Sequence, residues 1–250
     1  MAVTGTNLYF QYGTGAFPDQ RWNSPILFDE WARGIRADTP EGRRRVAEVS
    51  DYMWHGTQYY TVVVDSLLVP LAFDRFNLDV ALQMNLLNWQ AIGLSFFILR
   101  LTHVTVGRAR PSEYGCSNEP GARFPCVKGR GPSFMGGHVA MAATGAGLAC
   151  AHHNALPLYG GGWPDIAACV VLSASAVTVG VLRGVADKHW ASDNILGGLV
   201  GGAIGFGLPY LLHYRYGHRE GFAAGRLGSR LVVAPLVSDD VWGVGVSGFL

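Results

Sequence analysis

The chain has 250 residues, of which 49% are hydrophobic and only 15% are charged. Since a typical soluble domain carries about 25% charged residues, this composition favours a protein with unusually extensive apolar surface. The formal net charge is +1, so no global field would attract nucleic acid, and nucleic acid is excluded as an expected partner. The length suits one domain with a sizeable core.

The chain divides into three parts by composition. Residues 1–50 are expected to form an N-terminal surface segment with an amphipathic helix around Ile26–Ile35. Residues 51–216 hold the long uncharged runs and are expected to form an all-α helical domain. Residues 217–250 form a C-terminal tail, in which apolar residues alternate over Arg230–Leu250 around a polar turn. This alternation predicts a short β-hairpin.

Five apolar runs predict a helical membrane bundle with about five spans. About 20 apolar residues cross the hydrocarbon core of a bilayer, with a usual range near 17–25. An apolar soluble helical core is the alternative. The expected spans are Met53–Phe73, Val80–Leu99, Val139–Pro164, Ile166–Leu182 and Asn194–Tyr214.

Glycine spacing favours the membrane alternative. Gly197, Gly201 and Gly205 recur every four residues, and so do Gly198 and Gly202. Small residues at this spacing let helices approach closely in lipid. In a soluble helix each glycine would cost about 1 kcal/mol. We therefore expect the last run to pack tightly against another helix of the bundle.

The segment RGVADKHWASD has the residue types of an oxyanion site. His189 and Asp193 are four residues apart, so on one helix they would share a face. A carboxylate there can hold one imidazole nitrogen and leave the other free as a nucleophile or base. Arg183 adds a permanently charged fork that binds oxyanions. A salt-bridged helix start would give the same pattern, so the three residues alone leave both interpretations open.

Two upstream clusters supply further groups for the same chemistry. His103 precedes Arg110 by seven residues, close to two helical turns, which predicts that both project from one side of one helix. The segment SFMGGH is a glycine-rich turn that leads into an apolar helix and ends at His138. Backbone amides at a helix N-terminus bind anions. Two histidines, two arginines, a carboxylate and this turn together favour phosphoryl transfer.

With these motifs the chain resembles the type 2 phosphatidic acid phosphatase (PAP2) superfamily, which includes bacterial acid phosphatases and vanadium haloperoxidases. The family pattern is Lys-x6-Arg-Pro, then Pro-Ser-Gly-His, then Ser-Arg-x5-His-x3-Asp. In this chain the motifs read HVTVGRARP, MGGH and LRGVADKHWASD, and the resemblance covers roughly residues 50–215. It implies the all-α PAP2/haloperoxidase fold, with the three motifs on one face of the membrane.

The resemblance also implies a role for each matching residue. His189 would attack phosphorus and form a phosphohistidine, and Asp193 would orient it. His138 would protonate the leaving oxygen. The phosphate would be bound by Arg110, Arg183, the amide of Gly137 and the residue at the family lysine position, His103.

Three positions depart from the family pattern. The family lysine is His103, the serine of the second motif is Gly136, and the serine of the third motif is Leu182. The first change replaces a fixed positive charge with a group that is mainly neutral at pH 7. A donor of this kind commonly contributes roughly 3–4 kcal/mol to transition-state stabilisation. Arg108 and Lys188 are among the basic residues that could substitute for it.

The sequence therefore predicts a metal-independent phosphatase that hydrolyses a lipid-linked phosphomonoester or pyrophosphate. It needs no cofactor, because the flanking arginines favour an anion over a metal at the histidines. The resemblance places the protein in a bacterial inner membrane as a multi-pass protein, with its site facing the periplasm. Two alternatives remain open: a non-catalytic membrane subunit that retains the fold, and a vanadate-dependent haloperoxidase. Protein partners cannot be predicted.

The four cysteines fall into two pairs of positions. Cys116 and Cys126 lie in the loop between the first two motifs, and if that loop is periplasmic they are expected to form a disulfide rather than remain free thiols. Cys150 and Cys169 lie inside apolar runs and are expected to be buried, unpaired small residues. His152 and His153 follow His138 by about 21 Å of helix, which places them far from the predicted site.

Overall fold

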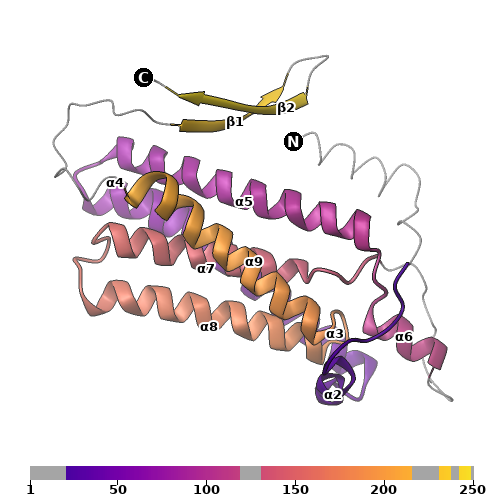
Figure 1. The fold of residues 1–250 in the computed structure, drawn as a ribbon. Helices are drawn as coiled ribbons and strands as arrows, with labels where there is room; N and C mark the ends of the chain where they lie inside the picture. The colour runs from indigo at the N-terminus through magenta and orange to yellow at the C-terminus, as the bar shows by residue number, and fades with distance from the viewer. Residues whose placement is uncertain (1–20, 119–130, 216–230, 238–241, 249–250) are drawn as a thin grey trace.

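The computed structural model describes residues 21–118, 131–215, 231–237 and 242–248. Long helices dominate this part of the chain and pack side by side into a bundle (Figure 1). The helical elements are α2 (Asp29–Ala32), η2 (Arg33–Ile35), α3 (Pro40–Tyr59), η3 (Tyr60–Leu68), α4 (Val69–Phe73), α5 (Leu78–Val106), α6 (Pro111–Asn118), α7 (Gly137–Ala155), α8 (Trp163–Val185), α9 (Ala191–Pro209) and η4 (Tyr210–Tyr214). The strands are β1 (Leu231–Val237) and β2 (Trp242–Gly248).

Local sequence signals set the ends of the long helices. α3 begins after Thr39, whose side chain accepts a hydrogen bond from Gly42 N at 3.1 Å, as an N-cap residue does. Asn77 caps α5 in the same way, through Val80 N. α5 ends at Gly107, which has a φ of 60° and so takes the left-handed conformation that stops a helix. Arg110 therefore follows the helix that carries His103, and the prediction of one shared helix face is wrong.

α7 lies at the centre of the bundle and packs closely against α9. A Cβ atom on Gly201 would overlap the carbonyl oxygen of Ala140, and one on Gly205 would overlap that of Thr144. A Cβ on Gly197 would lie 2.6 Å from Gly136 O. The predicted glycine contact is therefore confirmed for this set of glycines. In the second set, a Cβ on Gly198 would make an ordinary contact with Val139 Cγ1 at 3.5 Å, and one on Gly202 would meet no atom of the described residues within 4 Å. The second set therefore does not force the close approach.

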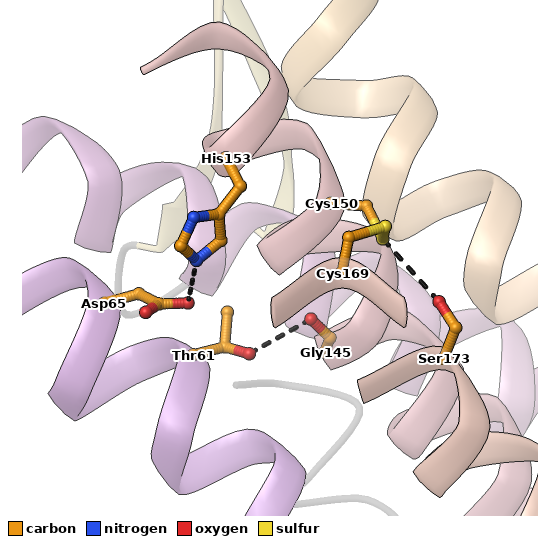
Figure 2. The surroundings of a disulfide bond; sticks show 7 residues. All are labelled: Thr61, Asp65, Gly145, Cys150, His153, Cys169 and Ser173. Atoms are coloured by element: carbon orange, nitrogen blue, oxygen red, sulfur yellow. Dashed lines mark hydrogen bonds and ion pairs between the residues drawn. A yellow bond between two sulfur atoms is a disulfide. The ribbon is translucent and has the colours of Figure 1, made fainter. Parts of the chain in front are cut away.

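α7 and α8 form an antiparallel hairpin that a disulfide joins. Cys150 and Cys169 are bonded, with Cα atoms 4.5 Å apart, so the prediction of unpaired cysteines is wrong. The two positions are nearly equally far from the middle of the connection between the helices, and such positions face each other in a helical hairpin. Figure 2 shows the bond with Ser173 beside it on α8. Cys126 and the side chain of Cys116 lie outside the described residues.

The exterior of the long helices is strongly apolar. On α5, Leu86 and Trp89 are 63% and 62% exposed, and on α8 Val171 is 65% exposed. Within the described ranges, two helical stretches are long and apolar enough to cross a membrane: Trp163–Val185 and Ala191–Tyr214. The other three expected spans form helices in the bundle, but five spans are not confirmed. The architecture is an all-α bundle with apolar outer faces.

The two segments outside the bundle differ in how well the sequence predicts them. The N-terminal segment has less helix than expected, and the C-terminal hairpin matches the prediction. The helix expected around Ile26–Ile35 is reduced to the short elements α2 and η2. Its apolar residues Leu27 and Trp31 are 86% and 83% exposed, which agrees with a surface segment. β1 and β2 pair antiparallel with Leu231 opposite Gly248. The predicted C-terminal hairpin is present.

Four helix ends meet at one end of the bundle. α5 and α8 finish there, α7 and α9 begin there, and α2 and α6 lie beside them (Figure 1). The three sequence motifs lie at these helix ends or in their connections. The helix arrangement thus gathers segments that are far apart in the sequence, as expected from the order of the apolar runs.

Candidate functional site

His189 lies in the connection between α8 and α9. Its side chain is buried, and Nδ1 is 2.8 Å from the carbonyl oxygen of Ser133. Because a carbonyl can only accept, Nδ1 carries the hydrogen and Nε2 keeps its lone pair. Burial lowers the pKa of His189 well below its usual value, and the charges of Arg110 and Arg183 lower it further. His189 is therefore a neutral imidazole with one nucleophilic nitrogen.

Asp193 supports this arrangement indirectly. It is the third residue of α9, and its Oδ2 accepts from Trp190 N at 3.3 Å, which caps the helix. Ser133 Oγ donates a hydrogen bond to the same carboxylate. The carbonyl oxygen of Ser133 accepts the hydrogen bond from Nδ1 of His189. The prediction that His189 and Asp193 share one helix is wrong, because α9 begins at Ala191, after the histidine. Ser133 links the two side chains instead.

A buried ion network holds Asp193 in place. Arg108 is fully buried, and its guanidinium binds Asp193 Oδ1 at 2.5 Å and Asp29 Oδ2 at 2.6 Å. Burial alone would raise the pKa of Asp29, but hydrogen bonds from Ser192 and Arg108 bring it below its usual value. Arg108 therefore forms ion pairs with two carboxylates and does not substitute for the missing family lysine.

Arg183 and His138 meet at a carboxylate that the motifs do not contain. Arg183 is 5% exposed at the end of α8, and its Nη1 lies 2.8 Å from Asp51 Oδ1 and 3.2 Å from Ser50 Oγ. His138 Nε2 is 3.0 Å from the same Asp51 oxygen. The ring centroids of His138 and His189 are 6.5 Å apart. The structure therefore brings His138, His189 and Arg183 together, with Asp51 from α3 between two of them.

Arg110 approaches the same space from the segment before α6. Its Nε donates to Gly131 O at 3.2 Å and its Nη1 to Lys188 O at 3.3 Å. The second bond ties Arg110 to the residue next to His189. Arg110 thus lies beside the connection that carries His189, and its phosphate-binding role stays a prediction.

His103 and the glycine-rich turn form the wall of the site. His103 Nε2 lies 3.1 Å from Met135 O, so this side chain holds the turn before α7. A Cβ on Gly136 would lie 2.6 Å from Asn194 Oδ1, which explains glycine at the family serine position. A Cβ on Gly137 would lie 3.1 Å from Leu99 Cδ2. Phosphate binding by His103 and by the Gly137 amide stays a prediction.

The sequence interpretation missed the charged residues outside the motifs. Asp51 precedes the first apolar run, and Asp29 lies in the surface segment. An acidic side chain at the edge of an apolar run is a weak signal for a site residue, since most such groups are solvated. Ser133 was identified only as the start of a turn. Among the described residues, no cluster of histidine, cysteine and carboxylate side chains could hold a metal ion.

The comparisons with known proteins show the family of this chain and a similar fold. The family model of the PAP2 superfamily matches residues 89–216, and the chain belongs to this family. No match was found among curated proteins. The fold is similar to the crystal structure of the first transmembrane PAP2 type phosphatidylglycerolphosphate phosphatase from Bacillus subtilis, with a TM-score of 0.53 and 17% identity over 78% of this chain and 86% of that chain.

Proposed function

We propose that the protein is a metal-independent phosphatase that hydrolyses a lipid-linked phosphomonoester or pyrophosphate. The observation that carries the proposal is the meeting of two imidazoles and two arginines at one end of the bundle. His138 and His189 lie 6.5 Å apart between centroids. Arg183 and His138 both contact Asp51 Oδ1, and Arg110 is hydrogen-bonded to Lys188 O, next to His189. Such a site binds an oxyanion and offers both a nucleophile and an acid.

The reaction would proceed in two displacements. In the first, Nε2 of His189 attacks phosphorus, a P–N bond forms, and the P–O bond to the alcohol or phosphate breaks. His138 in its protonated form gives a proton to the leaving oxygen. In the second, His138 takes a proton from water, which attacks the phosphohistidine and releases phosphate. Arg183 and Arg110 would stabilise the negative charge in both transition states, and the Asp193–Ser133 pair would keep Nδ1 of His189 protonated.

A long apolar cavity supports a lipid-linked substrate. Its volume is about 630 Å³, and it is bounded by α7, α8 and α9. His189 and Trp190 border one part of the cavity, and Gly202 and Phe206 border another more than two helical turns further along α9. The intervening lining is mostly small side chains, which leave room for a hydrocarbon chain. A lipid bound there could present its phosphate to His189.

The apolar exterior favours a multi-pass membrane location. A soluble protein rarely exposes large contiguous apolar patches, whereas a bilayer would cover the outer residues of α5 and α8. The catalytic end would then lie at the membrane surface, where lipid phosphates are. We propose that this surface is periplasmic, by resemblance to the family.

Phosphate release by purified protein in detergent micelles tests the proposal. A lipid phosphomonoester should be hydrolysed, and His189→Ala should lower kcat at least about 10³-fold because the nucleophile is lost. The melting temperature of the variant should show that it folds. A ³²P-labelled substrate should leave an acid-labile, alkali-stable label on the native protein and none on the variant.

Other outcomes favour the alternatives. Equal background rates for the native protein and His189→Ala would indicate a non-catalytic membrane subunit. Vanadate-dependent bromination without phosphate release would indicate a haloperoxidase. Loss of activity on chelation of divalent ions would contradict the metal-independent mechanism. A soluble aryl phosphate cleaved as fast as the lipid would contradict a role for the apolar cavity.

A further inference from the structure

Asp51 is an acidic residue within the predicted phosphate site. It lies on α3, which contributes to none of the three motifs. One of its oxygens, Oδ1, is 2.8 Å from Arg183 Nη1 and 3.0 Å from His138 Nε2. These two nitrogens belong to the groups that the proposed mechanism assigns to the phosphate and its leaving oxygen. The carboxylate therefore occupies the positions next to Arg183 and His138 that a substrate oxyanion needs.

The chemistry of the two acceptors makes them competitors. Carboxylate and phosphate oxygens both accept charge-assisted hydrogen bonds from guanidinium and imidazole groups. The Nε of Arg183 is buried and has no hydrogen-bond partner within the described structure. A buried donor in this state is costly, and an oxyanion larger than a single carboxylate oxygen could satisfy it. The Asp51 contact therefore leaves one N–H donor of Arg183, at Nε, without a hydrogen bond.

The two partners differ in their freedom to move. The Arg183 side chain is 5% exposed, whereas the Asp51 side chain is 47% exposed. A half-exposed carboxylate can turn toward water at little desolvation cost, but a buried guanidinium cannot. The pair can therefore open by rotation of Asp51 alone, and Arg183 would stay in position for a new anion.

We propose that Asp51 is a displaceable occupant of the phosphate site and thereby weakens the binding of anions there. The inference rests on the proposed phosphatase function. Any anion that binds Arg183 must first displace the carboxylate, so the displacement cost raises the dissociation constants of dianions and monoanions by the same factor. A phosphomonoester dianion attracts Arg183 strongly enough to meet this cost. Asp51 thus keeps Arg183 paired until a tightly bound anion arrives.

Inhibition constants of two anions test this inference. Inorganic phosphate represents the dianion and dimethyl phosphate the monoanion, each measured against hydrolysis of a lipid phosphomonoester. Because both anions must displace the same carboxylate, Asp51→Asn should bind each of them about tenfold more tightly than the native protein, the size expected from removing one competing charge-assisted hydrogen bond. Inorganic phosphate, which carries the larger charge, should gain at least as much as dimethyl phosphate. Asp51→Ser provides a second variant if the amide disturbs folding.

Glu48→Gln is the matched control. It removes the same charge from the same helix, but Glu48 pairs with Arg44 at the surface and should leave both inhibition constants unchanged. Unchanged constants in Asp51→Asn together with a lower kcat would overturn the inference and make Asp51 a residue that positions His138. If the native protein neither releases nor binds phosphate, the proposed function fails. If it does both and Asp51→Asn is identical to it, only the Asp51 inference fails.

Discussion

The two ends of α7 both carry histidines, but the hydrogen bonding of the rings differs. At the far end, His153 Nδ1 is 2.6 Å from Asp165 and Nε2 is 3.3 Å from Asp65. Figure 2 shows this ring pointing at Asp65 across the gap to η3. His152 is likewise bonded at both nitrogens, to Tyr214 and Asn88. These rings have no nitrogen left for a ligand.

The motif end has incompletely bonded rings. Within the described part of the chain, His138 Nε2 lies 3.0 Å from Asp51 Oδ1, and His189 Nδ1 is hydrogen-bonded to Ser133 O. Each ring therefore keeps one nitrogen available. Burial does not distinguish a structural histidine from a chemical one, because His189 is as buried as His152 and His153. The number of satisfied ring nitrogens does, because proton transfer and nucleophilic attack both need an uncommitted nitrogen.

Among substitutions that test this difference between the two ends, the largest expected effect is the loss of catalysis at the motif end. His138→Ala should lower kcat on a lipid phosphomonoester by about 10²–10⁴-fold, since it removes the general acid. An aryl phosphate with a good leaving group should be affected much less, because its leaving oxygen needs no proton. Steady-state rates on both substrates measure this ratio. Equal losses on the two substrates would contradict an acid role for His138.

The far end should respond in stability rather than in rate. His153→Ala leaves Asp65 and Asp165 without their shared partner, and breaking a buried pair in this way costs about 3–5 kcal/mol. Denaturant titration in detergent should show this loss, while the kcat of the folded fraction stays near that of the native protein. His55→Ala, at an exposed position of α3, is the control and should stay within about 0.5 kcal/mol. Lost catalysis at unchanged stability would invalidate the comparison.

The smallest effect is a pH dependence of stability that His189 contributes. Burial first, and then the nearby arginines, holds its pKa in the folded state well below the ordinary value of 6.5. Below that pH the unfolded chain binds a proton that the folded chain does not. The free energy of unfolding should therefore fall as the pH decreases, by up to about 1.4 kcal/mol per unit from this residue.

His189→Asn removes that contribution. Melting temperatures measured at pH 7 and pH 5 should decline less steeply for the variant than for the native protein. Identical slopes would show that the folded protein takes up the proton on His189 as readily as the unfolded chain. That result would also remove the reason for calling His189 a neutral nucleophile.

Much of the fold follows from local sequence patterns. The apolar runs predict the helices of the bundle, and the alternation after residue 230 predicts the hairpin. The four-residue spacing of Gly197, Gly201 and Gly205 predicts a close helix contact, and the structure confirms it. These features depend on neighbours within a few turns of chain, which is why spacing alone reveals them.

Errors occurred where a helix boundary changed the geometry. The spacing of His103 and Arg110 suits one helix, but Gly107 ends α5 between them. The spacing of His189 and Asp193 also suits one helix, but α9 starts after the histidine. The apolar surroundings of Cys150 and Cys169 within their own helices predict buried thiols and do not indicate the bond between them. The symmetry of the two positions about the α7–α8 connection was the signal that could have revealed it.

By itself the sequence determined the family motifs, the order of the helices and the end of the bundle at which the motifs meet, because short-range spacing and apolar length are written along the chain. Only the tertiary structure decided which partner each charged group has. Arg108 forms ion pairs with Asp29 and Asp193. Ser133 links Asp193 to His189. Asp51 contacts both Arg183 and His138. These pairings depend on distances between helices, which no spacing along one helix encodes.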